Sequence, residues 1–188
     1  MNDKQKQIIE ATICLFAKDG VGVATAKIAK EAGVSNGTLF NYFDTKQALI
    51  EGVYLYIKEK MAADIIAGLD FNADMKTIFL NVWQNYSIWS WDNTMEHQVI
   101  NLLTSSQILS ADVKKAEDSL WLTLHDIVEN GIKDKTLIPA PDLYLCDVAA
   151  GQLNATILYA RANNFKKKDL PALVDLGFSI YWNGISNT

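Results

Sequence analysis

Apolar residues recur along most of the chain at the three- and four-residue spacing of one helical face. No segment combines the two-residue alternation of a strand with a hairpin turn. Helix start and stop signals divide the pattern, for example Asp19-Gly20 after the first stripe. The sequence therefore predicts an all-α chain. The predicted helices cover residues 4–18, 25–32, 36–42, 46–67, 75–89, 97–107, 113 to about 130, about 143–163 with Asp142 as its cap, and a last one from 169–171 onward.

The shortest predicted helix, residues 36–42, lies in the stretch GVSNGTLFNYF. Gly33 allows a sharp turn before it, and Ser35 is a good N-cap. Seven residues at about 1.5 Å each give a helix of roughly 10 Å, which is too short to be stable alone. It must therefore be held from behind by its apolar residues, Leu39 and Phe43.

Two short helices joined by a glycine-containing turn are typical of a helix-turn-helix. The remaining face of the second helix carries Asn36, Thr38 and Asn41, with Gly37 between them. These side chains hydrogen-bond base edges and phosphates, and a glycine allows close approach to a duplex. The alternative interpretation is an ordinary turn between packed helices.

A longer motif favours the first interpretation. It comprises Ile8-Ile-Glu-Ala and Phe16, Gly20, Ile28-Ala, Ala32-Gly-Val-Ser35, Gly37-Thr-Leu-Phe40, Tyr42-Phe43, Lys46 and Leu49. Residues 5–49 thereby resemble the N-terminal domain of the tetracycline-repressor (TetR/AcrR) family. The resemblance implies an all-α, homodimeric repressor, with a three-helix DNA-binding head and a roughly six-helix body that binds a small-molecule effector. We therefore expect a DNA-binding domain at residues 1–47 and an effector-binding and dimerisation domain at 48–188.

The resemblance also assigns contacts to double-stranded operator DNA. The expected DNA-binding residues are Thr25, Ala26, Lys27, Asn36, Gly37, Thr38, Asn41, Tyr42 and Lys46. Two positions depart from the family pattern. Phe40 stands where tyrosine is usual, which removes one phosphate contact, and Ala26 stands where a larger polar residue can reach a base.

The later helices are rich in aromatic residues, and effector pockets are typically apolar with a few polar groups. An apolar or aromatic effector would be bound by Trp83, Tyr86, Trp121, His125 and Asn154. The alternative is that these residues are ordinary core. Small and apolar residues on the last two helices predict a homodimer interface, the alternative being burial within one protomer. The expected interface residues are Ala149, Leu153, Leu173, Gly177, Ile180 and Tyr181.

Composition limits the remaining possibilities. The net charge of −5 is unevenly distributed, because residues 1–60 hold eight Lys and seven acids, whereas residues 61–188 hold nine Lys plus Arg and fifteen acids. We expect no cofactor, no metal site, no membrane span and no enzyme activity, since no ligand-spaced cluster, apolar run or nucleophile–base pair occurs. Cys14 and Cys146 are expected to be reduced core thiols, which fits a cytoplasmic protein. The acidic balance leaves a second hypothesis open, a small-molecule-binding or scaffold protein of the same fold with weak or lost DNA binding.

Overall fold

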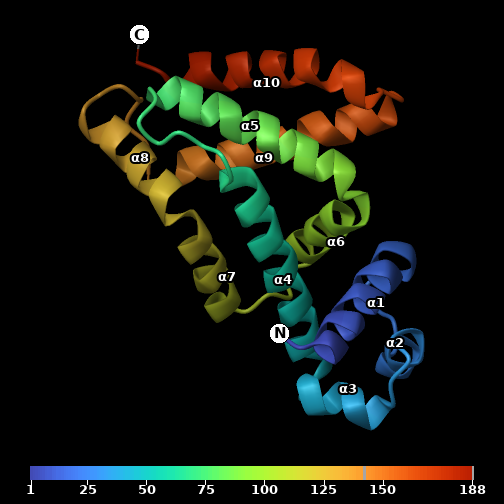
Figure 1. Cartoon of the computed structure of the whole chain (residues 1–188). Helices are drawn as coiled ribbons and strands as arrows, with labels where there is room; N and C mark the ends of the chain where they lie inside the picture. Colours follow the sequence, from blue (N-terminus) through green and yellow to red (C-terminus); the bar gives the residue numbers. More distant parts are fainter. Residues whose placement is uncertain (142, 188) are drawn as a thin grey trace. The chain divides into compact units, whose positions relative to one another are not determined.

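A computed structural model describes residues 1–141 and 143–187, and in this part of the chain the fold is all-helical (Figure 1). The predicted cap Asp142 lies outside the described residues. The helices are α1 (Asp3–Asp19), α2 (Thr25–Glu31), α3 (Asn36–Tyr42), α4 (Lys46–Ile66), α5 (Met75–Asp92), α6 (Thr94–Ser105), α7 (Ala111–Asp118), α8 (Leu122–Lys133), α9 (Tyr144–Ala162) and α10 (Leu170–Ile185), with short 3-10 turns η1 (Ser119–Trp121) and η2 (Lys167–Asp169).

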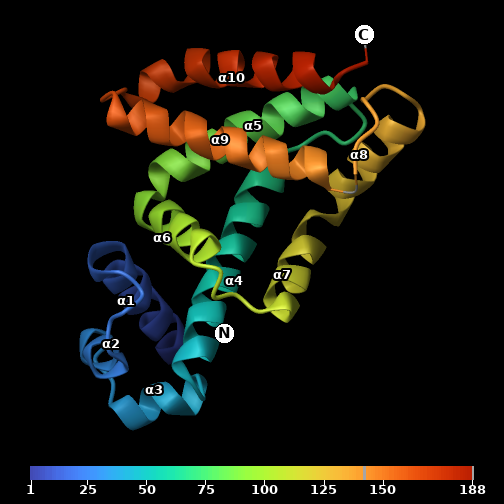
Figure 2. The ribbon, with the colours of Figure 1, turned by 180° about the vertical axis from the view of Figure 1, so that it is seen from behind.

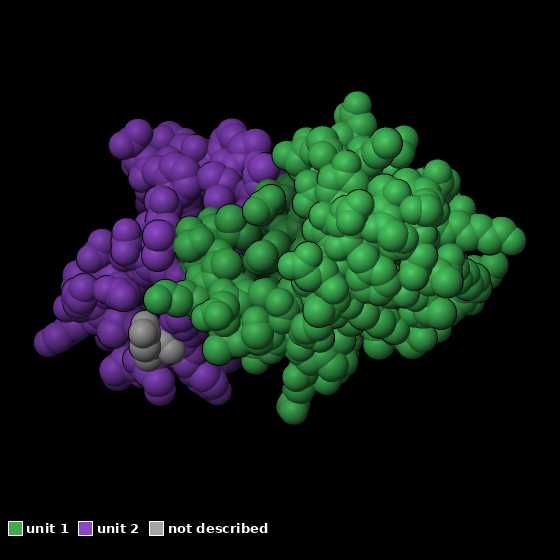
Figure 3. Space-filling view, turned by 90° about the horizontal axis from the view of Figure 1, so that it is seen from below, with its two compact units in different colours: residues 1–60, 93–120 green, residues 61–92, 121–188 purple. Residues whose placement is uncertain are grey.

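The chain divides into two compact units, shown in different colours in Figure 3. Unit 1 consists of Met1–Lys60 and Asn93–Leu120, and unit 2 of Met61–Asp92 and Trp121–Thr188. Unit 1 therefore contains α1 to α3, most of α4, and also α6 and α7. The functional boundary expected between residues 47 and 48 stays a prediction, because structural compactness and binding role are different properties.

Unit 1 is organised around the apolar face of α1. Asn2 caps this helix by accepting a hydrogen bond from the Gln5 N–H at 2.9 Å, and Gly20 ends it with a φ of 78°. α1 packs against α2 and α6, which lie on either side of it in Figure 2. The predicted face is buried as expected, with Ile8, Ile9, Thr12, Leu15 and Phe16 inside.

Unit 2 is built on three long helices, α5, α9 and α10, which run alongside one another (Figure 1). Trp83 of α5 is only 2% exposed and makes an edge contact with the ring of Phe178. Tyr181 packs on the same indole and donates its hydroxyl hydrogen to the Leu145 carbonyl at 2.9 Å. Gly177 brings α10 close, since an added Cβ would lie 3.2 Å from both Trp83 and Thr156.

The prediction of a single helix from residue 113 to about 130 is wrong. Two helices, α7 and α8, occupy this stretch and are separated by η1. The apolar stripe continues through the break, so periodicity alone does not reveal it. Gly131 also does not end a helix. It lies inside α8, where an added Cβ would come within 2.6 Å of Met75 and 2.9 Å of Leu137, so close packing requires glycine there.

Three smaller expectations are corrected. α6 begins at Thr94 rather than at residue 97. Cys14 is exposed on α1 and Cys146 is half-buried, so neither is a fully buried core thiol, although neither forms a disulfide among the described residues. Cys14 faces outward because its neighbours Ile13 and Leu15 occupy the buried face. None of the described helices combines the length and the apolar character that crossing a bilayer requires.

Candidate nucleic-acid interface

α3 is stabilised at its start by the residue that the sequence indicates. Ser35 Oγ accepts a hydrogen bond from the Thr38 N–H at 2.9 Å and lies 2.8 Å from the Thr38 hydroxyl. Gly33 adopts a φ of 66°, the left-handed conformation that the preceding turn needs. Leu39 is fully buried and Phe43 nearly so. A helix too short to persist alone is thus held by one cap and two apolar anchors.

The opposite face of α3 is available to a partner. Asn36, Gly37 and Asn41 are exposed, while Thr38 and Tyr42 are half-buried. Thr38 keeps its hydroxyl beside Ser35, so its reach toward a base depends on rotating away from that contact. The arrangement leaves two amide side chains, with paired donors and acceptors, facing solvent on one short helix.

α2 begins at Thr25, the first of the residues expected to bind DNA. Its N-cap is Ala24, and no side chain caps the helix. Lys27 is exposed, but its Nζ lies 2.8 Å from Asp19 Oδ2 at the end of α1. The hydrogen bond from Lys27 lowers the pKa of Asp19. Asp19, which the sequence indicated only as a stop signal, therefore holds a lysine that was predicted to approach DNA.

α4 starts on a cap from Thr45, whose Oγ1 accepts from the Ala48 N–H at 3.0 Å. Lys46, the first residue of the helix, is half-buried. The sequence Asp44-Thr-Lys-Gln47 resembles a capping box with Gln47 in the role of glutamate, but Gln47 does not complete one. Its Nε2 donates instead to Glu51 Oε1 and to the Ile108 carbonyl, both at 2.7 Å. Because α4 begins at Lys46 after the cap Thr45, Gln47 is its second residue, one position short of the place that a capping box requires.

A contact between Phe43 and Gly52 fixes α3 on α4. An added Cβ on Gly52 would lie 2.8 Å from Phe43 Cε1, so the ring rests directly on the helix backbone. Phe43 is the C-cap residue of α3 and donates its N–H to the Leu39 carbonyl at 3.0 Å. The position of the exposed face of α3 consequently depends on a glycine nine residues later, which sequence reasoning missed.

The residues predicted to bind an effector all lie in unit 2. Trp83 is buried and packs against the ring of Phe178. The other four residues are half-buried: Tyr86, Trp121, His125 and Asn154. Burial raises the pKa of Tyr86. The Oδ1 atom of Asn154 is buried and has no hydrogen-bond partner among the described residues. Within those residues, no group of three His, Cys, Asp or Glu side chains could hold a metal ion.

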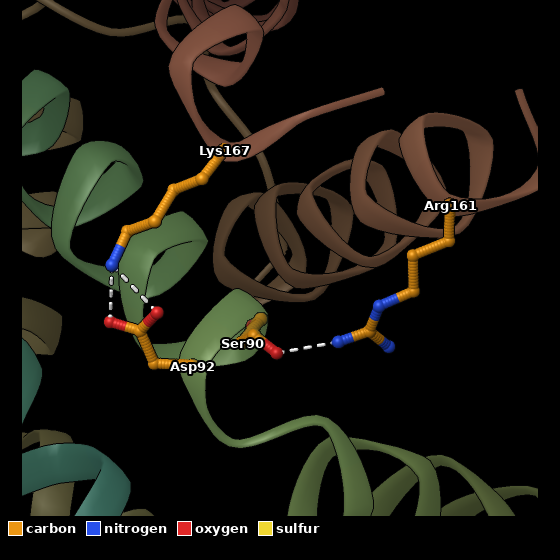
Figure 4. A network of polar contacts seen from close by, with 4 residues as sticks. All are labelled: Ser90, Asp92, Arg161 and Lys167. Carbon is orange, nitrogen blue, oxygen red and sulfur yellow. Dashed lines mark hydrogen bonds and ion pairs between the residues drawn. The ribbon is translucent and has the colours of Figure 1, made fainter. Parts of the chain in front are cut away.

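Polar contacts connect the C-terminal end of α5 to α9 and η2 in unit 2 (Figure 4). The Arg161 guanidinium of α9 donates to the Ser90 carbonyl at 2.5 Å, near the end of α5. Lys167 Nζ reaches both carboxylate oxygens of Asp92 at 2.6 and 2.7 Å. Cations at a helix C-terminus interact favourably with its dipole, so these contacts tie the end of α5 to α9 and η2.

The predicted dimer residues differ in their exposure. Leu153, Gly177 and Tyr181 are buried inside the protomer, and Ala149 and Leu173 are half-buried. Ile180 is 61% exposed. Several other large apolar side chains of α9 and α10 are exposed, and together with Ile180 we call them the α9/α10 face: Tyr144, Val148, Leu158, Tyr159, Leu176 and Ile180. Most of these positions were missed, because a strongly apolar helix does not reveal which side is covered.

Comparisons with known proteins agree with this geometry. The model of the family "Bacterial regulatory proteins, tetR family" matches residues 8–53. A tetR-family transcription regulator from Shewanella sp. PV-4 has a similar structure, with 25% identity, a TM-score of 0.92 and full coverage of both chains. The fatty acid metabolism regulator protein of Bacillus subtilis is 25% identical over 98% of this chain and 96% of its own.

A nucleoid occlusion factor, SlmA of Vibrio cholerae, is 22% identical over 96% of this chain and 92% of its own. The matched segment spans α1 to α3 and the start of α4, which are the elements that present the exposed face of α3. The full-length structural likeness extends the agreement to the remaining helices. The chain belongs to the tetR family of bacterial regulatory proteins.

Proposed function

We propose that the protein is a homodimeric transcriptional repressor that binds a near-palindromic operator and releases it when a small apolar or aromatic molecule binds. The observation that carries the proposal is the two-sided character of α3. Leu39 and Phe43 are buried while Asn36 and Asn41 face solvent. Recognition helices of a two-fold dimer enter successive major grooves, about 34–36 Å apart.

The α9/α10 face supports the homodimer. Ile180 and Leu176 of α10 are 61% and 57% exposed, and Tyr159 of α9 is 54% exposed. Side chains of this size seldom gather on the surface of a monomer without a partner. A second copy of the chain is the partner proposed here, because a two-fold arrangement buries the same face on both protomers.

Asn154 supports an effector site in unit 2. A buried carbonyl oxygen without a hydrogen-bond partner is unfavourable unless something else donates to it. A bound molecule with one N–H or O–H group and an apolar body would meet that requirement. Tyr86 and Trp121, half-buried on the core of the same unit, would pack against its apolar part.

DNA binding is tested by selection from a random pool of duplexes, followed by alanine replacement of Asn41 and of Thr38. Loss of a good base contact is worth about 1–3 kcal/mol, or roughly 5- to 150-fold in affinity for each half-site. Asn130→Ala, an exposed asparagine of α8, is the matched control. Unchanged affinity and sequence preference in the Asn41 and Thr38 variants would defeat the assignment. A protein that selects no sequence would favour the second hypothesis, a scaffold with lost DNA binding.

A further inference from the structure

Within unit 1, α4 is joined to the segment that leads into α7 by a first polar contact. Gln47 Nε2 donates to the Ile108 carbonyl at 2.7 Å and to Glu51 Oε1 at 2.7 Å. Glu51 Oε1 also accepts from the Ser110 N–H at 3.2 Å. The hydrogen bond from Gln47 lowers the pKa of Glu51. One carboxylate on α4 therefore holds the N-cap residue of α7.

A second polar contact joins the same two helices further along. Tyr54 donates its hydroxyl hydrogen to Glu117 Oε2, and Lys58 Nζ lies 2.5 Å from Glu117 Oε1. The Lys58 and Glu117 side chains are only 14% and 19% exposed, so water screens this pair less than it screens a surface ion pair. Burial, together with the contact to Glu117, raises the pKa of Tyr54, which keeps its hydroxyl protonated as a donor.

The two contacts are matched in spacing on both helices. Glu51 and Lys58 are seven residues apart on α4, and Ser110 and Glu117 are seven residues apart at α7. Seven residues correspond to about two turns and roughly 10 Å of helix. Two attachments at that separation oppose both sliding and rotation of α7 along α4, which a single attachment would allow.

We propose that Glu117, with Tyr54 and Lys58, is a positioning site that fixes α4 against α7 and thereby sets the orientation of the recognition helix α3. The proposal rests on the proposed DNA-binding function. α3 is carried by α4 through the contact of Phe43 with Gly52, so a change in the orientation of α4 reaches α3 without an intervening flexible link. These positioning residues lie outside the set expected to touch DNA.

Three near-isosteric variants test the positioning site in the full-length protein. Glu117→Gln removes the charge, Tyr54→Phe removes the hydroxyl, and Lys58→Met removes the ammonium while keeping most of the stem. Glu129→Gln is the matched control, because Glu129 pairs with Lys133 at 3.1 Å in an exposed (i, i+4) ion pair. Thermal unfolding first establishes that each variant is folded.

The readout is discrimination between two duplexes, the one that the wild-type protein selects from a random pool and the same duplex with one base pair inserted between its half-sites. We expect the wild-type protein to prefer the selected spacing by tenfold or more. The three variants should bind the selected duplex roughly three- to tenfold more weakly and should lose most of the preference for spacing. The double variant Tyr54→Phe/Glu117→Gln should be no worse than the weaker single variant, since both changes break one interaction.

If these residues merely stabilise the fold, the three variants will have lower melting temperatures and an unchanged preference for spacing. This result would overturn the proposal. So would an equal loss of preference in Glu129→Gln. A wild-type protein that selects no duplex would refute the proposed function itself, whereas wild-type selection with unchanged variants refutes only the positioning site.

Discussion

Replacing Gly52 with alanine should weaken operator binding more than it changes stability. The added methyl would lie 2.8 Å from Phe43 Cε1, 3.5 Å from Cδ1 and 3.7 Å from Cζ. Carbon atoms in contact are normally about 3.5–4.0 Å apart, so the ring must move by roughly 1 Å. Phe43 is 6% exposed and caps α3, and its displacement therefore carries the recognition helix with it.

Two opposing terms determine the change in the free energy of unfolding. Alanine is favoured over glycine inside a helix by about 1 kcal/mol. Overpacking a filled site costs about 1–3 kcal/mol. The net loss of stability is therefore between zero and about 2 kcal/mol, too small to unfold an ordinary domain. Hydrogen bonds to base edges tolerate a shift of 1 Å poorly, because they weaken steeply with length and angle.

Chemical denaturation and fluorescence anisotropy on a labelled operator duplex measure the two effects separately. Operator affinity should fall by tenfold or more, with two half-sites affected in each dimer. Phe43→Leu, with its smaller side chain, should partly rescue Gly52→Ala, so the double variant should bind DNA better than Gly52→Ala does.

The reasoning fails if Gly52→Ala raises the free energy of unfolding by about 1 kcal/mol, the difference in helix propensity alone, and binds the operator normally. That result would mean that the ring of Phe43 adjusts without moving α3. It also fails if the double variant binds DNA more weakly than either single variant, because the two changes would then act independently of the contact between them.

Other changes test the remaining contacts. Asp19→Asn should release Lys27 and raise operator affinity severalfold at low salt, as measured by anisotropy; equal affinity would show that Lys27 does not reach a phosphate. Gly131→Ala should lower the free energy of unfolding by up to about 2 kcal/mol in urea denaturation, because overpacking against Met75 and Leu137 below 3 Å exceeds the gain in helix propensity; a stabilised variant would contradict the packing. Ile180→Asp should shift the protein from dimer to monomer in sedimentation without lowering its helix content, and an unchanged mass would remove the α9/α10 face from the interface.

Much of the fold could be predicted from local chemistry. Helices that end on Gly20 and turn at Gly33 obey rules that concern a few neighbouring residues, and both glycines adopt the positive φ that those rules require. Ser35 caps α3 for the same reason. The bounds of α3 are correct because cap, anchors and the following stop all agree.

Contacts between residues far apart in the sequence could not be predicted from such local rules. Gln47 fits a capping box locally, yet it bonds the carbonyl of Ile108, sixty-one residues later. Gly52 and Gly131 look like unremarkable or terminal glycines until the side chains that meet them are known. The break at Ser119–Trp121 is likewise invisible to periodicity, because apolar spacing continues across it.

The distribution of lysine residues predicts how strongly DNA binding depends on salt concentration. Of the residues expected to contact DNA, only Lys27 and Lys46 are cationic, and Lys27 is already paired with Asp19. Two lysines in each of two protomers neutralise at most four phosphates, and the logarithm of the binding constant should then fall with a slope of about −3.6 against the logarithm of salt concentration. A basic reader with eight contacts would show about twice that slope.

Because so few phosphates are neutralised, the affinity for DNA must depend on hydrogen bonds from α3 to the bases. Those hydrogen bonds require accurate placement of the helix. The Gly52–Phe43 contact and the Glu117 site should therefore matter more in this protein than in a more basic reader. A salt titration on the selected duplex measures the slope. A value near −8 would mean that other lysines of unit 1 engage the backbone, and it would remove the reason to expect such sensitivity to positioning.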